Sequence, residues 1–562
     1  MAAGAGKNLR ASRAAGLTVA VAVALAVAVA LVAVGCSSPA ATTAPGTIRP
    51  GGDIAIAAER EPQCMDWIST CAGVDWGIYM VQANTMPRAY DYTGAGYQPS
   101  IVLAGPAEVG SGPQQVTYHL NPKAVWDDGR RITSHDFKYT WDQIAHGQRI
   151  FDQTGYNQIK SVDDTNPDTA VVTFSSNYPD WQMLFGGIYG ILPSHILEGR
   201  DRATLMRDGY NFSAGPWKMD HWTRGTEVKL VPNPAYWGRK PILASVTFQF
   251  ITDPSAERDA YRSGQVLAAY PQPEPGVEAL KGLPGTLFDA VVGLSYEGLW
   301  FNVEKSPLNS KAVRQALAYA TDRDGIVSQL FGSISPGIRP VNSLATPAFG
   351  ATYTEPYAKF HRDLTMVDQL MAADGWAKGA DGIWAKAGTQ ATLDLKFTVN
   401  DPRRLLMAQA IQTQWQQAGF RLSLTAQHPG TLLGQDLPQG NFAVSLYGQT
   451  TIDNDPGECV IWCSKNIPTL ANGYSGQNWT RTNDPTLDKL WLDADANLDP
   501  GARAGDSGRA QAILADLVPV IPLDPLPDIL VVNTDRLGVD RGSFQHNFAY
   551  GPFVNMNAWY AK

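Results

Sequence analysis

The chain after residue 50 alternates between the hydrophobic period of strands and that of helices. Strand-like apolar patterns occur at 52–57, 116–120, 246–250 and 421–424, where alternate side chains can face a core. Helical segments lie between them. Strands that alternate with helices over this length predict an α/β fold with several sheets.

Three segments carry apolar residues three or four positions apart, which predicts amphipathic helices over 136–144, 311–320 and 404–418. Ser310 can cap the second helix at its N-terminus. Gly419 can end the third helix at the C′ position. The chain shows neither a short-period repeat nor heptads.

The N-terminus has a different pattern, in which a positively charged segment precedes a long apolar run. Lys7, Arg10 and Arg13 come before an almost unbroken apolar stretch over 16–35. A run of about 20 apolar residues could span a bilayer. A secretory signal peptide with a long hydrophobic region is the competing interpretation.

The end of the apolar run favours the signal peptide. Ala33-Val34-Gly35-Cys36 resembles the bacterial lipobox, although Ala33 stands where leucine is usual. We therefore expect a lipoprotein signal peptide over 1–36, a lipidated Cys36 and a flexible linker over 37–50. An uncleaved helix with an incidental cysteine is the alternative. Either arrangement leaves the remaining chain outside the cytoplasm, attached at its N-terminus.

Composition limits the classes of function. The 562 residues carry a net charge of −9, with 44% hydrophobic and 17% charged residues, as in an ordinary globular protein. This length predicts two or three folding units after the linker. The negative charge and the lack of a Lys/Arg run argue against a nucleic-acid partner. No second long apolar run follows residue 52, which predicts a soluble body.

The chain has five cysteines. Apart from Cys36, the other four form two pairs that are close in sequence, Cys64 with Cys71 and Cys459 with Cys463. Even pairing in an oxidising compartment favours two disulfides with short loops. A zinc site is the alternative, but no histidine lies near either pair. We expect neither a metal nor a cofactor.

A distinctive motif lies at 125–137, which reads VWDDGRRITSHDF. It predicts a turn at Asp128-Gly129 followed by a helix that begins near Thr133-Ser134. The motif resembles the W-x-D-G-x-x-x-T-A-x-D-V signature of the family 5 (oligopeptide, dipeptide and nickel) extracellular solute-binding proteins. Further elements that resemble this family follow in the family's order, at 191–196, 213–218, 233–238, 300–317 and 373–376. The resemblance spans about residues 50 to 525.

The resemblance implies an α/β, bilobal periplasmic-binding-protein-like fold of class II, the peptide-binding type, with an additional domain. We expect lobe I to be discontinuous, over 51–85, 190–290 and 520–562. The additional domain is expected over 86–189 and lobe II over 291–519. In such a fold the lobes close on a ligand about a hinge.

The implied function is that of the substrate-binding lipoprotein of an ABC importer. It would capture di- or oligopeptides outside the cytoplasm, as a membrane-anchored monomer, and deliver them to permease and ATPase subunits. The same carrier role for an oligosaccharide, a nickel chelate or a glutathione-like solute is the alternative. A secreted hydrolase is the alternative from another class. The chain has no G-x-S-x-G or H-E-x-x-H motif and its eight histidines are scattered. We therefore do not expect this protein to be an enzyme.

In peptide-binding relatives, a strand that ends in Gly-Trp leads to an aspartate that pairs with the α-amino group of the peptide. Matching Asp455-Pro456 to the family's Asp-Pro places Ile452 at this anchor position and Asp453 one residue later. A buried ammonium needs an anion, so Asp453 is the candidate anchor and Asp455 a weaker one. The competing interpretation is a turn that caps the next helix.

Tyr447 and Trp462 are candidate aromatic contacts for the ligand, and Gln449 lies in the same stretch as Tyr447. Either ring could instead belong to the core. We expect the Cys459–Cys463 pair to brace this region, and Arg314 to be structural rather than a clamp for a carboxylate. The motif tryptophans are interpreted as packing residues, namely Trp126, Trp217 and Trp237.

Overall fold

The part of the chain from residue 49 to 562 forms one compact unit in the computed structural model. The residues that it describes are 50–69, 71, 75–93, 96–110, 112–148, 150, 153–186, 189–344, 353–450, 458–539 and 551–562. Among these residues, no helix has the length and apolar character needed to cross a membrane. The predicted signal peptide, Cys36 and nearly all of the linker lie outside the described residues.

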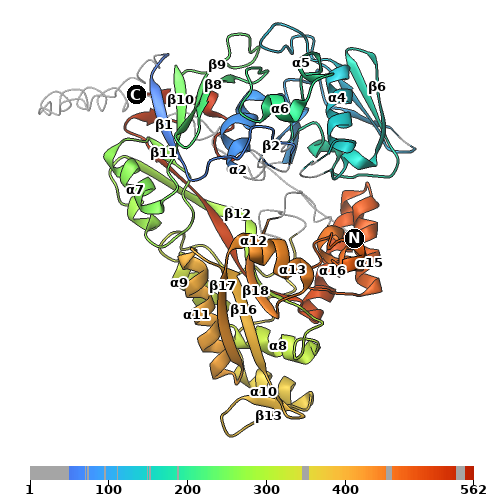
Figure 1. Ribbon diagram of the computed structural model, residues 1–562, viewed down its shortest axis with the longest axis vertical. Coiled ribbons are helices and arrows are strands. Elements are labelled where there is room, and N and C mark those ends of the chain that lie inside the picture. Colours follow the sequence, from blue (N-terminus) through green and yellow to red (C-terminus); the bar gives the residue numbers. More distant parts are fainter. Residues whose placement is uncertain are drawn as a thin grey trace, which may run out of the picture. The chain divides into compact units, whose positions relative to one another are not determined.

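A ten-stranded sheet organises this unit (Figure 1). β1 pairs in parallel with β10 and β11, whereas β12 is antiparallel to both β18 and β19. In spatial order the strands are β17 (Arg421–Gln427), β16 (Thr392–Thr398), β18 (Val444–Thr450), β12 (Thr286–Phe301), β19 (Val520–Asn533), β11 (Ala268–Ala269), β1 (Asp53–Ala58), β10 (Ser245–Phe250), β9 (Glu227–Pro232) and β8 (Trp217–Thr223).

A separate four-stranded antiparallel sheet packs against helix α4 (Ser134–Ala145). Its strands, in spatial order, are β4 (Glu108–Gly110), β5 (Gln115–His119), β7 (Thr169–Phe174) and β6 (Ile159–Asn166). Small hairpins are formed by β2 (Tyr90–Thr93) with β3 (Gly96–Pro99), by β13 (Ala377–Lys378), β14 (Trp384–Lys386) and β15 (Thr389–Gln390), and by β20 (Leu537–Gly538) with β21 (Tyr560–Ala561).

Helices pack against the ten-stranded sheet and against one another. α11 lies on β16 and β17, α8 packs on α10, and α15 packs on α16. The longer helices are α7 (Pro254–Ser263), α8 (Lys311–Ala320), α9 (Arg323–Phe331), α10 (Leu364–Ala373), α11 (Pro402–Gln417), α15 (Pro485–Ala496) and α16 (Pro500–Leu517). The short ones are α2 (Asp75–Gly77), α3 (Ala83–Thr85), α5 (Ser194–Leu197), α6 (Arg202–Met206), α12 (Pro429–Thr431), α13 (Leu437–Gln439) and α14 (Cys459–Trp462).

Two long strands connect separate hydrophobic cores. β12 has 16 residues and β19 has 14, and they pair from Thr286–Asn533 to Trp300–Val520. At one end their side chains pack into cores that also contain β1, and at the other end into a core built from residues 296–523. Figure 1 shows β12 and the red strand β19 running between these regions. A pair of strands that joins two cores in this way can serve as a hinge.

The strands and helices expected from periodicity are confirmed. β1, β5, β10 and β17 cover the four strand segments, and α4, α8 and α11 cover the three helices. Gly419, with φ of +93°, follows α11 as predicted. Ser310 occupies the cap position of α8, but its side chain makes no cap hydrogen bond. Its hydroxyl donates to Asp374 at 2.9 Å, which ties the start of α8 to the end of α10.

The motif residues hold neighbouring segments together. Gly129, with φ of +86°, forms the predicted turn, and Thr133 with Asp136 forms a capping box on α4. The other oxygen of Asp136 accepts bonds from the amide and hydroxyl of Ser194 at 2.8 and 2.7 Å. A side chain at Gly215 would collide with the carbonyl oxygen of Asn84, 2.3 Å from the added carbon.

The residues predicted to be structural have structural contacts. Trp126 and Trp217 are fully buried, and Trp237 packs against the same core. Arg314 is buried and donates to the carbonyl oxygens of Leu517 and Leu308 at 2.8 and 2.7 Å. Burial lowers the pKa of Arg314 to about 10. Its contacts with main-chain carbonyls explain why this arginine fixes α8 in place.

Both predicted disulfides are present. The Cα atoms of Cys64 and Cys71 lie 5.8 Å apart, and those of Cys459 and Cys463 lie 4.7 Å apart. The second bridge closes over α14, one turn long, just after the segment that contains the candidate anchor. The zinc alternative is therefore wrong for these two pairs, because their sulfur atoms are bonded to each other.

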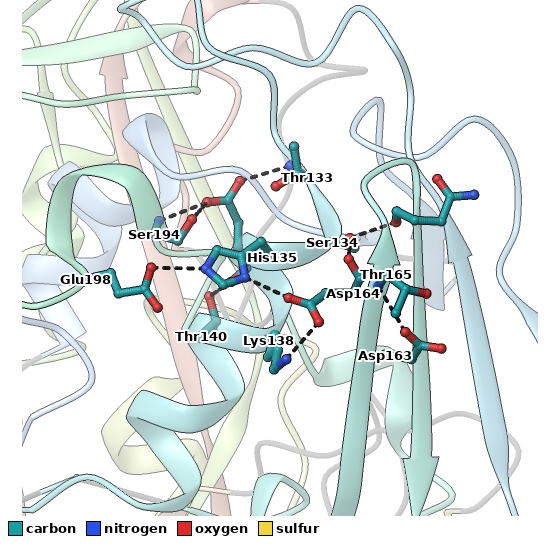
Figure 2. Close-up of polar contacts among 12 residues, drawn as sticks. Thr133, Ser134, His135, Lys138, Thr140, Asp163, Asp164, Thr165, Ser194 and Glu198 are labelled. Atoms are coloured by element: carbon teal, nitrogen blue, oxygen red, sulfur yellow. Dashed lines mark hydrogen bonds and ion pairs between the residues drawn. The ribbon is translucent and has the colours of Figure 1, made fainter.

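His135, within the signature motif, lies between two carboxylates (Figure 2). Its Nδ1 is 2.7 Å from Asp164 and its Nε2 is 3.0 Å from Glu198, while Lys138 donates to the other oxygen of Asp164 at 2.7 Å. Hydrogen bonds from the ring to Asp164 and to Glu198 raise the pKa of His135 above its ordinary value. The charged imidazolium therefore stabilises the contact between α4 and β6.

Replacing His135 with glutamine is expected to destabilise the protein more at pH 5.5 than at pH 8.5. A histidine pKa that is raised on folding stabilises the folded state below its unfolded value of 6.5. This stabilisation is lost as the pH rises through the folded-state pKa. The side chain is 44% exposed, so the difference should not exceed about 1 kcal/mol. Urea unfolding at both pH values measures it, with His428→Gln as the control, because His428 is exposed. Equal effects at the two pH values would contradict the assignment.

Candidate ligand site at the end of strand β18

β18 ends at the segment expected to contact the ligand. It runs antiparallel to β12, with Gly448 opposite Glu297 and Gln449 opposite Tyr296. The chain then passes through 451–457, outside the described residues, and returns at Glu458. Asp453 and Asp455 fall in that interval. Gln449 is half-buried and is the next-to-last residue of β18. It therefore lies close in sequence to the interval that contains Asp453 and Asp455.

The two candidate aromatic residues stack on one ring of the neighbouring strand β12. Tyr447 stacks on Trp300 of β12, with ring centroids 4.7 Å apart, and Trp462 lies 5.7 Å from the same Trp300 ring. The Trp462 ring is fully buried, and its Nε1 donates to Glu458 at 2.7 Å. The structure thus gives Tyr447 and Trp462 core contacts, and any contact of theirs with ligand stays a prediction.

A buried ion cluster lies beneath the end of β18. The carboxylate of Glu297, which is fully buried, accepts from Arg403 at 3.0 Å and from Arg404 at 2.8 Å. Asp401 caps α11 and lies 3.3 Å and 3.4 Å from the same two guanidinium groups. The cluster lies directly beside Gly448, because a carbon added there would be in ordinary van der Waals contact with Glu297 at 3.4 Å and Arg404 at 3.7 Å.

The two arginines keep Glu297 ionised. Burial alone would raise the pKa of this carboxyl, but the charges of Arg403 and Arg404 hold it below its ordinary value. Arg404 also donates to the Thr398 hydroxyl at 2.7 Å. Both guanidinium groups therefore pair with carboxylates within the protein, which fixes the start of α11 against β12, although Nη1 of Arg403 has no hydrogen-bond partner among the described residues.

Asp524 on β19 adds a third carboxyl group to this cluster. The pKa of Asp524 is raised to about 7, mainly by burial. The Glu297 carboxylate also raises this pKa, whereas Arg403 lowers it. Neither of its carboxylate oxygens has a hydrogen-bond partner among the described residues. Glu297, Asp401 and Asp524 thus share the surroundings of two arginines, and the raised pKa of Asp524 reflects this excess of carboxyl groups as well as burial.

The segment after β11 brings further acidic groups to this region. Burial raises the pKa of Glu274, and the neighbouring carboxylate of Asp401 raises it further. Gln272 donates to Glu59, at the end of β1, at 3.0 Å. Asp401 and Glu274 both remain partly exposed. Two acidic groups near the cluster are thus partly exposed, beside Arg404, whose side chain is 17% exposed.

Sequence reasoning missed this cluster because its members come from separate segments. One signal was available. Glu297 is the one charged residue in the apolar stretch Leu294–Phe301, and a charge in a buried strand requires a partner. The partner could not be identified, since Arg403 and Arg404 also fit the exposed face of a helix.

A groove of about 380 Å³ occurs elsewhere on the chain. It contains none of the sequence-predicted site residues, so its position lends no support to the candidate site. It is lined mainly by residues of α6, β8 and the segment between them, including Leu205, Tyr210, Phe212, Met219 and Trp222.

Comparison with known families gives one match over most of the chain. The family described as "Bacterial extracellular solute-binding proteins, family 5 Middle" matches residues 98–467. The oligopeptide-binding protein OppA of Mycobacterium tuberculosis (strain H37Rv) is 27% identical over 498 residues, covering 84% of this chain and 80% of OppA.

Solved structures show the same fold. A periplasmic EDTA-binding protein, EppA, superposes with a TM-score of 0.82 at 22% identity and covers 92% of this chain and 97% of its own. The oligopeptide-binding protein AppA from Bacillus subtilis, in complex with a nonapeptide, gives 0.73 at 20% identity and covers 92% and 100%. The predicted α/β periplasmic-binding-protein-like fold is thereby confirmed.

Proposed function

Because the chain belongs to the bacterial extracellular solute-binding proteins of family 5, we propose that it captures peptides with a free α-amino group. Family membership makes it the extracytoplasmic substrate-binding component of an ABC importer, which has a transport role without enzymatic turnover. The nature of the solute is the proposal. The oligopeptide-binding name of the curated relative supports it.

The observation that carries the peptide assignment is the use of both arginines beneath β18 by Glu297 and Asp401. An anionic ligand would need free cations, and these two are already paired. The partly exposed acidic groups nearby, Asp401 and Glu274, favour a ligand with a positive group. A peptide α-ammonium meets this requirement.

The capture mechanism follows from this charge and from the strand edge. We assign the contact with the α-amino group to Asp453, because an ammonium held away from water needs an anionic acceptor. Main-chain pairing with the protein would bind the rest of the peptide with little dependence on its side chains. Contacts made only when the lobes close would shift the population to the closed state. Acylation of Cys36 would keep the protein near its permease.

A metal chelate is the second candidate, since the neighbour EppA is an EDTA-binding protein. EDTA complexes present several carboxylates, which require cationic contacts. The pairing of Arg403 and Arg404 within the protein argues against such a ligand at the end of β18. The two solute classes therefore make opposite demands on the charge of the site.

Thermal shift measurements distinguish the two classes. Tetrapeptides with a free N-terminus are expected to raise the Tm of the purified chain, because a ligand that binds only the folded state stabilises it. The same peptides acetylated at the N-terminus should give a smaller shift, and Asp453→Asn should remove the difference between them. A shift with nickel–EDTA, together with none from any peptide, would contradict the proposal.

A further inference from the structure

A buried ion pair joins the four-stranded sheet region to helix α16. Arg503, in the first turn of α16, donates through one nitrogen to both carboxylate oxygens of Asp180, at 2.9 and 3.1 Å. Their side chains are only 7% and 12% exposed. Nearby, the amide of Asn177 donates to the carbonyl oxygen of Ala496, the last residue of α15, at 3.1 Å.

The two sides of this contact belong to different hydrophobic cores. Tyr178 and Leu184, which flank Asp180, pack into the core that contains β1 and the four-stranded sheet. Leu487 and Leu514, from α15 and α16, pack into the core formed by residues 296–523. The sequence separation of the bonded pairs exceeds 300 residues. The ion pair is therefore a connection between two cores that the hinge strands β12 and β19 also join.

The position of Arg503 is not explained by the stability of its own helix. The N-terminal end of a helix carries partial positive charge, which disfavours a cation in the first turn. Asp499 already caps α16 through the amide of Ala502 at 2.7 Å. The contact with Asp180 supplies the anion that a buried guanidinium requires. Opening of the lobes would separate the pair and return both ions to water.

We propose that Arg503 and Asp180 form a latch between the four-stranded sheet region and helix α16, and that this latch favours the closed arrangement independently of ligand. The latch is defined as these two side chains. It acts on the open–closed equilibrium, because separating the two cores breaks it. By raising the fraction of protein already in the closed state, it tightens the apparent affinity for any ligand that binds that state.

The test measures closure in the absence of ligand, so its result does not depend on the identity of the solute. Small-angle X-ray scattering is recorded from the chain beginning at residue 37, freed of bound solute, for wild type, Arg503→Met and Asp180→Asn. Arg509→Met is the matched control, since Arg509 lies on the same helix, is 67% exposed and pairs only locally with Asp506. We expect both latch variants to increase the radius of gyration and the control to leave it unchanged.

Affinity gives the second measurement. Binding is measured with tetrapeptides and with nickel–EDTA. Both latch variants should weaken the binding of whichever probe binds wild type by at least about tenfold. The control variant should bind as wild type does. Asn177→Ala removes the neighbouring hydrogen bond without uncovering a charge, so it gives a smaller change in the same direction even if a charge variant folds poorly. Scattering curves of the latch variants that superpose on wild type would overturn the proposal. A matching expansion in Arg509→Met would also overturn it.

Discussion

Replacing Glu297 with glutamine is expected to lower the free energy of unfolding by about 3–5 kcal/mol at neutral pH. Glutamine keeps the size of the side chain but removes the charge that both arginines share. Arg403, which is almost completely buried, would then have Asp401 as its hydrogen-bonded anion and Asp524 as a more distant carboxyl group. Because the pKa of Glu297 is lowered by folding, the contribution is present above the unfolded pKa and is lost as the pH falls through the folded value.

Urea unfolding at pH 7 measures this effect. Asp368→Asn is the control, because it breaks an exposed pair with Lys378 and should cost less than about 1 kcal/mol. The double variant Glu297→Gln, Arg403→Gln should lose less than the sum of the two single variants, since it no longer buries an uncompensated cation. A loss for Glu297→Gln as small as that of the control would show that the cluster does not stabilise the hinge region.

Replacing Glu458 with glutamine is expected to stabilise the protein progressively as the pH rises from 5 to 9. The pKa of Glu458 is raised to about 8, mainly by burial. The charge of Asp495 also raises this pKa, whereas the hydrogen bond from Trp462 lowers it. The pKa is therefore higher in the folded state than its ordinary value of 4.5. A raised carboxyl pKa makes folding less favourable as the pH rises between these two values. Glutamine cannot ionise, and its carbonyl oxygen can still accept from Trp462.

The gain should be small at pH 5 and on the order of 3 kcal/mol at pH 9. It is measured as the difference in unfolding free energy between variant and wild type across this range. Glu304→Gln provides the control, because the Glu304 side chain is 62% exposed. Parallel stability curves for Glu458→Gln and wild type would contradict the assignment of a protonated, buried carboxyl beside the ligand segment.

Local patterns in the sequence were sufficient for individual elements. Alternation predicted β5, helical spacing predicted α8, and the Asp128-Gly129 pair predicted a turn that Gly129 forms with a positive φ. These features depend on neighbours within a few residues. The resemblance of ordered motifs then gave the family and the fold, which periodicity alone could not provide.

The sequence alone could not predict which distant strands pair with each other. β12 pairs with β19 over more than 200 residues of separation, and nothing in either strand identifies the other. The ion cluster required that pairing to bring Asp524 beside Glu297. The aromatic candidates show the same limit, since Tyr447 and Trp462 meet Trp300 only through the sheet. The domain boundaries and the ligand residues remain predictions.

Native mass spectrometry of the chain from residue 37, purified without denaturation from cells grown in peptide-rich medium, tests the peptide assignment most directly. The account predicts a set of bound masses that fragment as peptides with free N-termini. It also predicts that Asp453→Asn retains less of this material. A single bound mass that fragments as a metal chelate or a sugar would contradict the peptide assignment.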